Sequence, residues 1–286
     1  MPIFTEMPES INCTPYPQWL DSHCHFDFTC FDPDRDKQWQ QLQYFGCAGL
    51  VIPGVEANTW HNLIQLCESK PGGYALGLHP YFLEQHSGGD MKRLAELCQQ
   101  QLLDPSSHLV AIGEFGLDFA LTQKEHAKQV EWCQQQFKLA QGLQLPVILH
   151  IRKAYDETCA MIRRLGFNQG GIVHAFSGSY QQAEALIKLG FKLGVGGAMS
   201  HARATKLRTT ISRLPLDCMV LETDSPDMRP AFWKNADNSP VSLLFLAQMV
   251  ASLHQCSLAE VIFASNNNLL AALPNLSLIV EMNNKV

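Results

Sequence analysis

Short runs of apolar and β-branched residues recur along the chain and alternate with longer, more polar segments. A strand that is covered on both faces shows a continuous apolar run instead of strict alternation. Each run therefore predicts a buried parallel strand. The eight runs lie at residues 19–22, 49–53, 74–78, 109–113, 147–150, 171–174, 191–194 and 218–221.

Most of the segments between these runs have the apolar spacing of a helix. The clearest is 124–141, where Val130, Cys133 and Phe137 recur at steps of three and four residues and Gly142 predicts the end. Further helices are predicted at 181–189, 241–253 and 258–270.

Eight alternations of strand and helix predict a (β/α)8 barrel of the TIM type in preference to a doubly wound sheet. No linker divides the chain, so we expect one barrel domain over residues 18–286. The polar, proline-containing residues 1–17 are expected to form an N-terminal extension, and 226–240 a long loop after the last strand.

Composition excludes several classes of protein. The chain has 286 residues, 46% of them hydrophobic and 17% charged, which is typical of a globular protein. No apolar run approaches the roughly 20 residues of a membrane span, and residues 1–10 lack the pattern of a secretion signal. We therefore expect a cytoplasmic protein with no membrane partner, and nothing in the sequence predicts an obligate protein partner.

Cysteine usage and charge narrow the picture further. The ten cysteines include no C-x-x-C pair, which favours reduced, mostly buried thiols over a disulfide framework. The formal charge of -6 argues against a broad basic face for long nucleic acid. A phosphate-containing substrate would have to be attracted locally.

Six candidate ligands follow or end the predicted strands. In a parallel barrel all carboxyl ends of strands lie at one mouth, where barrel active sites form, so we expect these side chains to meet there. They are His23 and His25 after the first strand, Glu114 after the fourth, His150 and His174 at the ends of the fifth and sixth, and Asp224 after the eighth.

Each candidate also has a simpler interpretation. His23 and His25 point to the same side of an extended chain, but an H-x-H pair alone is weak evidence for a metal. His150 and His174 interrupt apolar strands, and a single one of them could be an ordinary core histidine. Asp224 precedes Ser-Pro and could cap a helix. The combination at matching strand ends favours a metal site.

Six motifs resemble, in order, the signatures of the TatD family of metal-dependent deoxyribonucleases and hydrolases, within the amidohydrolase-like superfamily. Asp-Phe after H-x-H and Gly-Val-Gly-Gly at 194–197 are most similar to its YjjV-type branch. The resemblance covers roughly residues 20–270. The motifs are Asp-Ser-His-Cys-His-Phe-Asp (21–27), Gly-Leu-His-Pro (77–80), Ile-Gly-Glu-Phe-Gly-Leu-Asp (112–118), Leu-Pro-Val-Ile-Leu-His-Ile-Arg (145–152), His-Ala-Phe-Ser-Gly-Ser (174–179) and Leu-Glu-Thr-Asp-Ser-Pro (221–226).

The resemblance implies a barrel with two divalent cations that acts as a phosphodiesterase or nuclease. It implies that His23, His25 and Asp224 bind one ion, that His150 and His174 bind the other, and that Glu114 bridges them. It also suggests that Asp118 supports Glu114. Three positions depart from the pattern, and none is a metal ligand: Phe119, Lys153 and Ser239.

The residue types suggest a mechanism. Two divalent ions would activate water and stabilise an in-line displacement, with Glu114 and Asp224 as catalytic residues and Asp224 orienting or deprotonating the water. Counting only those two carboxylates, the ions would leave the site positive. Mixed imidazole and carboxylate ligands suit Zn, Mn or Fe, and Mg is the least natural partner for four histidines.

Other side chains could hold a DNA or small phosphodiester substrate. Arg152 faces the same side as His150 and could bind phosphate or form a salt bridge at the rim. His79 could donate to phosphate or support a turn. His201 and Arg203 follow the seventh strand, a common phosphate-binding position in barrels. For two further cations in this segment a solvated helix face is expected, namely Lys206 and Arg208.

Two other functions remain open from the sequence. Barrels of this type serve many chemistries, so hydrolysis of an amide, lactone or other ester is an alternative. A noncatalytic metal-binding or partner-binding barrel is a second alternative, although such a protein would be expected to lack at least one of the six ligands.

Overall fold

A computed structural model describes residues 17–234 and 237–283, with side chains up to Val280. The predicted extension over residues 1–17 lies outside the described residues except for Pro17. The division into an extension and one barrel domain stays a prediction.

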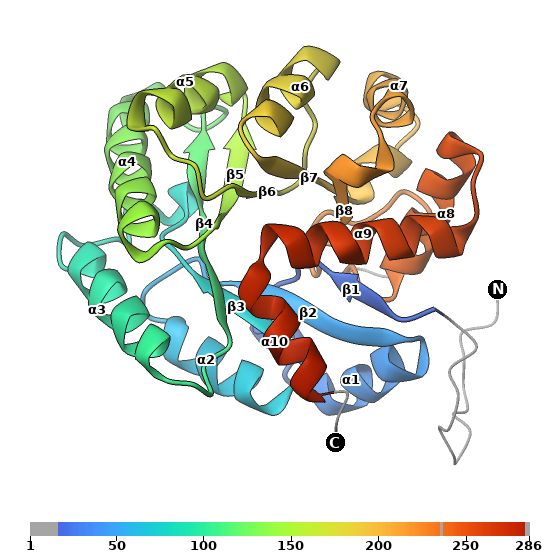
Figure 1. Ribbon diagram of the computed structural model, residues 1–286, viewed down its shortest axis with the longest axis horizontal. Coiled ribbons are helices and arrows are strands. Elements are labelled where there is room, and N and C mark those ends of the chain that lie inside the picture. Colours follow the sequence, from blue (N-terminus) through green and yellow to red (C-terminus); the bar gives the residue numbers. More distant parts are fainter. Residues whose placement is uncertain (1–16, 235–236, 284–286) are drawn as a thin grey trace.

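Eight parallel strands form one sheet in chain order, with helices around it (Figure 1). Every predicted strand overlaps an observed one, and the predicted (β/α)8 barrel is confirmed. The strands are β1 (Trp19–Asp21), β2 (Cys47–Pro53), β3 (Gly72–Leu76), β4 (Leu109–Asp118), β5 (Val147–Arg152), β6 (Gly171–Val173), β7 (Phe191–Val195) and β8 (Met219–Leu221).

Helices connect the strands and cover the outside of the sheet. The α-helices are α1 (Arg35–Tyr44), α2 (Trp60–Ser69), α3 (Asp90–Leu103), α4 (His126–Leu143), α5 (Tyr155–Leu165), α6 (Tyr180–Lys188), α7 (Thr205–Arg213), α8 (Ser242–His254), α9 (Leu258–Ala272) and α10 (Pro274–Asn283). The short 3-10 helices are η1 (Thr29–Phe31), η2 (Pro80–Phe82), η3 (Gln123–Glu125), η4 (Gly197–Ser200) and η5 (Leu216–Cys218).

Strand β4 extends five residues beyond its predicted end at Gly113. It stays paired with β5 up to Asp118, opposite Arg152. Gly116 makes this close pairing possible, because its φ is +155° and a Cβ there would lie 1.9 Å from the carbonyl oxygen of His150. The expectation that Glu114 follows the fourth strand was therefore wrong, since Glu114 lies within it.

The predicted end of the α4 helix was also wrong by two residues. The helix continues through Gly142 to Leu143, and Gln144 takes the left-handed conformation with φ 56° that closes it. The other predicted helices correspond to α6, α8 and α9 with shifts of one or two residues.

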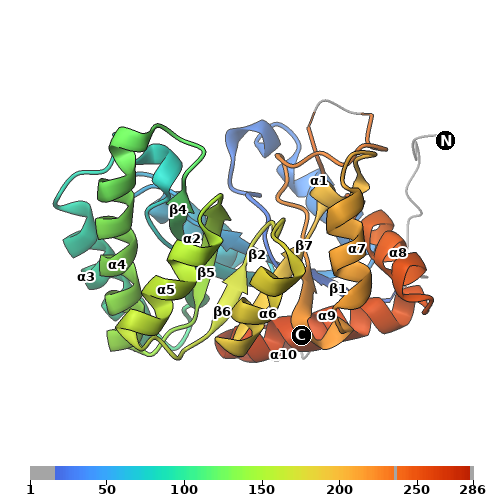
Figure 2. The same cartoon turned by 90° about the horizontal axis from the view of Figure 1, so that it is seen from above.

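Two apolar clusters hold the barrel together. The larger one lies between the outer face of the strands and the surrounding helices. The smaller one fills the barrel interior, where strand residues such as Ile148 and Ile172 share a cluster with Leu269 of α9, Leu276 of α10 and Leu273 between the two helices. These two helices run along one edge of the molecule, opposite the loops that follow β1 and β8 (Figure 2). One mouth is thus plugged, and the carboxyl ends of the strands face the other.

Strands β1 and β8 are joined without a regular β-ladder in the described part of the chain. Helix α9 packs against this seam. The side chain of Asn266 accepts a hydrogen bond from the Leu20 amide in β1, and the Ser265 hydroxyl accepts one from the Leu221 amide in β8. Beyond the strand ends, the amide of Asp224 donates to the carbonyl of His23 at 2.8 Å. The seam therefore closes directly at the candidate ligands.

The nine cysteines among the described residues are free, and seven are buried, as the sequence predicts. Cys13 lies outside the described residues. In the described ranges no single helix is long and apolar enough to cross a bilayer, although α8 and α9, which meet at a 107° bend, reach that length and character as a pair.

Candidate metal centre

Glu114 lies at the middle of a group of histidines in the open mouth. Its Oε1 is 3.2 Å from Nδ1 of His150, 3.3 Å from Nε2 of His79 and 3.4 Å from Nε2 of His174. The Glu114 side chain is only 2% exposed. A buried carboxylate with several imidazoles around one oxygen is suited to holding a cation at that oxygen.

The other oxygen of Glu114 faces a second group. Its Oε2 lies 3.2 Å from Nε2 of His23 and 3.7 Å from Nε2 of His25. Oδ1 of Asp224 lies 3.5 Å from both of these nitrogens. The six predicted residues therefore meet, and the two oxygens of one carboxylate face two different sets of donors.

Strand geometry explains the position of several of these side chains. His150 lies two residues after Ile148, and His174 two residues after Ile172, so each histidine faces the barrel interior directly above an apolar residue. In β8, Val220 occupies the same interior layer and Glu222 follows two residues later. The change from apolar to polar along each strand marks the boundary between the plugged core and the site.

The ring nitrogens of His23 support the interpretation that this group of residues binds metal ions. His23 is fully buried, yet neither of its ring nitrogens makes a hydrogen bond to any described residue. Buried polar atoms without partners are rare, because the loss of hydration is uncompensated. A cation at Nε2, beside Glu114 and Asp224, would satisfy this side chain. Ligand atoms close enough for one ion occur in three groups: His23, His25 and Asp224; His23, Glu114 and His174; and His79, Glu114 and His150.

Neighbouring carboxylates orient two of the histidines. Nε2 of His150 lies 3.3 Å from Oδ2 of Asp118, which leaves Nδ1 free to face Glu114 when Nε2 carries the hydrogen. Oε1 of Glu222 lies 3.5 Å from Nδ1 of His174 and also accepts from the amide of Ala175 at 2.6 Å. Such partners fix the ring orientation and tautomer of metal-binding histidines.

Two further carboxylates at the centre, Glu222 and Asp21, are buried and were not predicted as site residues. Asp21 accepts from the amides of His23 and Thr223 and from the Thr223 hydroxyl, so it ties the two sides of the seam together. Burial raises its pKa to about 8, despite these hydrogen bonds. Asp21 ends β1 and Glu222 directly follows β8, so a carboxylate at the end of an apolar run was a signal available in the sequence.

Burial and neighbouring charges shift the pKa values of several side chains at the centre in opposite directions. Burial opposes the charged form of Glu114, but the surrounding histidines hold its pKa well below the usual range. Burial also opposes the charged form of His174, yet Glu114, Asp224 and Glu222 raise its pKa to about 10. Burial raises the pKa of Asp224 well above its ordinary value. A cation that binds here would compete with protons for the same nitrogen and oxygen atoms.

The centre contains more negative side chains than the sequence analysis counted. Asp118 and Glu222 stand beside Glu114 and Asp224, so four carboxylates surround the site. Asp118 is also paired with Arg152, so these side chains together carry three net negative charges against the four positive charges of two divalent ions. The count of only Glu114 and Asp224 was therefore incomplete, and the positive charge of a metal-loaded site stays a prediction.

The remaining predicted residues differ in their distance from the centre. Arg152 forms the rim salt bridge that the sequence left open, with Nη1 3.7 Å from Oδ2 of Asp118, and its side chain is 63% exposed. Within the described ranges, no hydrogen bond or ion pair links the side chains of His201 and Arg203 to the centre. Lys206 is exposed, as expected. Arg208 is not a solvated helix residue, since its guanidinium donates to the carbonyls of Met199, His201 and Ala202.

Comparison with known proteins is consistent with this arrangement. The family model described as "TatD related DNase" matches residues 20–274. The metal-dependent hydrolase YjjV of Escherichia coli strain K12 is 36% identical over 252 residues, 88% of this chain and 96% of that protein. The 3'-5' ssDNA/RNA exonuclease TatD of Erwinia billingiae is 34% identical, over 79% of this chain and 87% of its own.

A solved structure of a relative has the same fold as this chain. The crystal structure of the E. coli TatD homologue YjjV superposes with a TM-score of 0.85 at 35% identity, covering 90% of this chain and 98% of that one. The family model, the relatives and the shared barrel agree over nearly the whole described chain. The chain therefore belongs to the TatD family of metal-dependent hydrolases.

Proposed function

We propose that this protein hydrolyses phosphodiester bonds with two divalent cations held at the Glu114 centre. The observation that carries the proposal is the position of Glu114, whose Oε1 faces His150 and His174 while its Oε2 faces His23 and His25. A bridging carboxylate between two nitrogen-rich groups is suited to a pair of ions, which is the arrangement that stabilises both the attacking and the leaving oxygen of a phosphoryl displacement.

We assign His23, His25 and Asp224 to one ion and His150 and His174 to the other, with Glu114 between them. Four imidazoles with carboxylates favour Zn, Mn or Fe over Mg. When bound, such ions supply Lewis acidity and make water a nucleophile at neutral pH.

Asp224 is the proposed proton acceptor. It lies at the open mouth on the β8 side of the seam, and its amide donates to the carbonyl of His23, which fixes its backbone. Its carboxylate is within 3.5 Å of Nε2 of His23 and of His25. From this position it can take the proton that an attacking water loses.

His79 is the proposed hydrogen-bond donor to substrate, because its tautomer is fixed. Nδ1 of His79 accepts from the amide of Tyr81 at 3.1 Å, so Nε2 carries the hydrogen when the ring is neutral. Nε2 lies 3.3 Å from Oε1 of Glu114, and from this position its N–H can donate to a phosphate oxygen at the centre. Arg152, at the rim, is a second proposed phosphate contact, and His201 and Arg203 are proposed contacts for more distant parts of the substrate.

The substrate class follows from the chemistry of the site and from a relative. One relative is a 3'-5' ssDNA/RNA exonuclease by name. The net charge of -6 does not suit long duplex nucleic acid. We therefore propose short or single-stranded DNA, or a small phosphodiester, as the substrate.

A metal-supplemented substrate screen tests this function. The purified protein is loaded in turn with Zn, Mn and Mg and assayed on bis-p-nitrophenyl phosphate, on DNA and RNA oligonucleotides, and on panels of lactones and amides. Turnover of phosphodiesters that disappears in Glu114→Gln and persists in His61→Asn, a variant of an exposed histidine, is the expected result. Turnover of lactones or amides with none of phosphodiesters would replace this function by the other ester or amide chemistry.

A further inference from the structure

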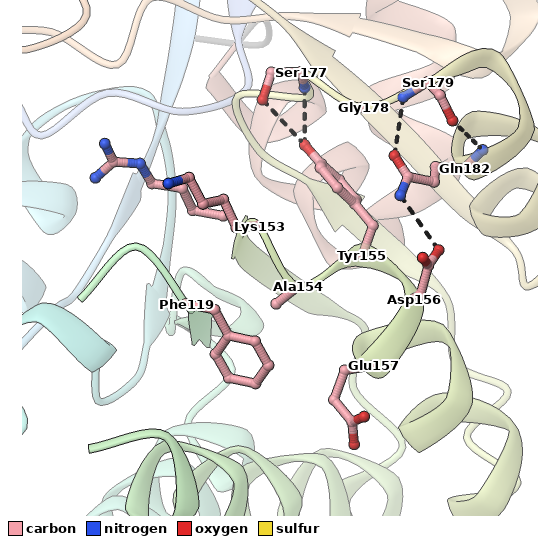
Figure 3. A pocket seen from close by; sticks show the side chains of 11 residues that line it. Phe119, Lys153, Ala154, Tyr155, Asp156, Glu157, Ser177, Gly178, Ser179 and Gln182 are labelled. Carbon is pink, nitrogen blue, oxygen red and sulfur yellow. Dashed lines mark hydrogen bonds between the residues drawn. The ribbon is translucent and has the colours of Figure 1, made fainter. Parts of the chain in front are cut away.

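A cavity of about 550 Å³ opens beside the metal centre, at the carboxyl ends of β5 and β6 (Figure 3). This volume is within the range of pockets that hold small organic ligands. Its walls are polar at most positions. The lining residues that matter for its chemistry are Phe119, Arg152, Lys153, Glu157, Ser177 and Gln182.

One carboxylate connects this cavity to the proposed metal ligands. Oδ2 of Asp118 lies 3.3 Å from Nε2 of His150 and 3.7 Å from Nη1 of Arg152. His150 faces the centre, and Arg152 lines the cavity. The cavity is therefore linked to the centre by two side-chain contacts, from Arg152 to Asp118 and from Asp118 to His150.

Lys153 is a cation without a partner at this cavity. In the described ranges its ammonium makes no hydrogen bond or ion pair. Its backbone is left-handed, with φ 54°, an uncommon conformation for a residue with a Cβ. At this turn the side chain points away from Asp156 and Glu157, the acidic residues of the first turn of α5 (Figure 3).

Lys153 and Arg152 also supply charge that the centre lacks. Four carboxylates would face two divalent ions, so the net positive charge of the loaded centre would be small, and a cation beside it adds to the attraction for an anion. Arg152 is already paired with Asp118. Among the residues that line this cavity, the cation without an ion pair is therefore Lys153.

The opposite part of the cavity suits a planar ring. Phe119 stacks on His126 with ring centroids 4.2 Å apart and 19° between planes, which holds the phenyl ring in place. The Phe119 ring projects toward the open space beside Ala154 and Glu157 (Figure 3). An aromatic face supports stacking of any nucleobase, and the Glu157 carboxylate can accept from exocyclic amino groups.

We propose that this cavity is a nucleotide subsite in which Lys153, assisted by Arg152, binds the phosphate next to the scissile one while Phe119 supports the base. The inference rests on the phosphodiester hydrolysis proposed above. It makes Lys153 a specificity-determining residue: substrates with a second phosphate are preferred over simple diesters.

The test compares Lys153→Gln with Lys188→Gln, an exposed lysine at the far end of α6. The substrates are bis-p-nitrophenyl phosphate, the dinucleotide dTpdT, and dTpdT with an added phosphate at its 5' or its 3' end. Wild-type kcat/KM is expected to be at least about tenfold higher for one terminally phosphorylated dinucleotide than for dTpdT. Lys153→Gln should remove most of this preference, change the rate on bis-p-nitrophenyl phosphate less than about twofold, and leave the thermal melt unchanged.

Calorimetric binding to metal-loaded protein that carries Asp224→Asn to slow turnover gives an independent measurement. In this background Lys153→Gln should weaken binding of the preferred phosphorylated dinucleotide about tenfold at low salt and by less at high salt, while Lys188→Gln changes neither.

Equal affinity and equal kcat/KM of the wild type and Lys153→Gln for every dinucleotide would overturn the subsite, even if phosphodiesters are cleaved. Lys153-dependent binding without cleavage of any phosphodiester would support the subsite and refute the proposed function.

Discussion

Asp224 has a backbone conformation that few residues adopt. Its φ is 55°, in the left-handed region where Asp and Asn occur more often than other residues with a Cβ. This turn carries the carboxylate from the end of β8 back toward His23 and His25. The sequence pointed to Asp224 as a ligand but could not show that its backbone is fastened to the other side of the seam.

Replacement of Asp224 by Asn tests its role as a proton acceptor. We expect Asp224→Asn to lower kcat on bis-p-nitrophenyl phosphate by about 10² to 10⁴, the usual contribution of a general base, because an amide cannot take a proton. At least one metal ion should remain bound, as measured by elemental analysis. Asp104→Asn, at an exposed position, is the control. Near-normal turnover of Asp224→Asn would exclude the proposed role.

The contact between Asp118 and His150 is expected to strengthen the binding of metal ions. Asp118→Asn removes the carboxylate that fixes the His150 ring, so we expect metal affinity to fall about 10- to 100-fold, measured by competition with a chelator. Asp104→Asn again serves as control. Unchanged affinity would mean that the His150 ring is held by other contacts.

Strand β4 shows what the hydrophobic pattern could and could not predict at the scale of an element. The apolar run at 109–113 located the strand, but the run ends where Gly113 and Glu114 begin the polar part. Pairing with β5 carries the strand on to Asp118. Hydrophobic periodicity indicates which residues are buried in an apolar layer. It does not indicate backbone pairing that continues among the polar residues of the site.

Two glycines in neighbouring elements should respond in opposite ways to alanine. A Cβ at Gly116 would lie 1.9 Å from the carbonyl oxygen of His150, so Gly116→Ala should lower the free energy of unfolding by about 1 to 3 kcal/mol or more. A Cβ at Gly142, in helix α4, would meet nothing within 4 Å beyond the backbone of its own helix, so Gly142→Ala should raise the free energy of unfolding by about 0.5 to 1 kcal/mol. Urea unfolding measures both. A neutral Gly116→Ala would show that β4 and β5 can separate without loss of stability.

At the scale of the whole molecule, the sequence predicted the barrel and the meeting of six side chains well. The barrel follows from the eight alternations of strand and helix, and the meeting of the side chains follows because the carboxyl ends of parallel strands share a mouth. Glu222, Asp118 and Asp21 were harder to place, because their importance depends on which atoms they face across the barrel. The same gap led to an incomplete count of the charged side chains around the proposed ions. Cytoplasmic location and the separate extension stay predictions.

Metal removal should lower the stability of the whole barrel. The proposed ligands come from β4, β5 and the segments after β1, β6 and β8, so ions bound only by the folded chain stabilise it by mass action. One ion at about 100 times its Kd contributes about 2.7 kcal/mol. We expect the melting temperature of wild type to fall in EDTA and to recover with Zn or Mn. Glu114→Gln should show a much smaller shift, and equal melting of wild type with and without metal would contradict the proposed centre.

The junction between β1 and β8 also bears on how the protein matures. Asp21 and Thr223 are 202 positions apart in the chain, so their hydrogen bond joins segments that are synthesised at very different times. During synthesis the residues near His23 leave the ribosome long before Asp224 is added. The His23, His25 and Asp224 group is then incomplete until the last strand emerges. Zinc uptake at that group is therefore expected to come after translation of the barrel, and ribosome-stalled chains that end before Met219 should lack it.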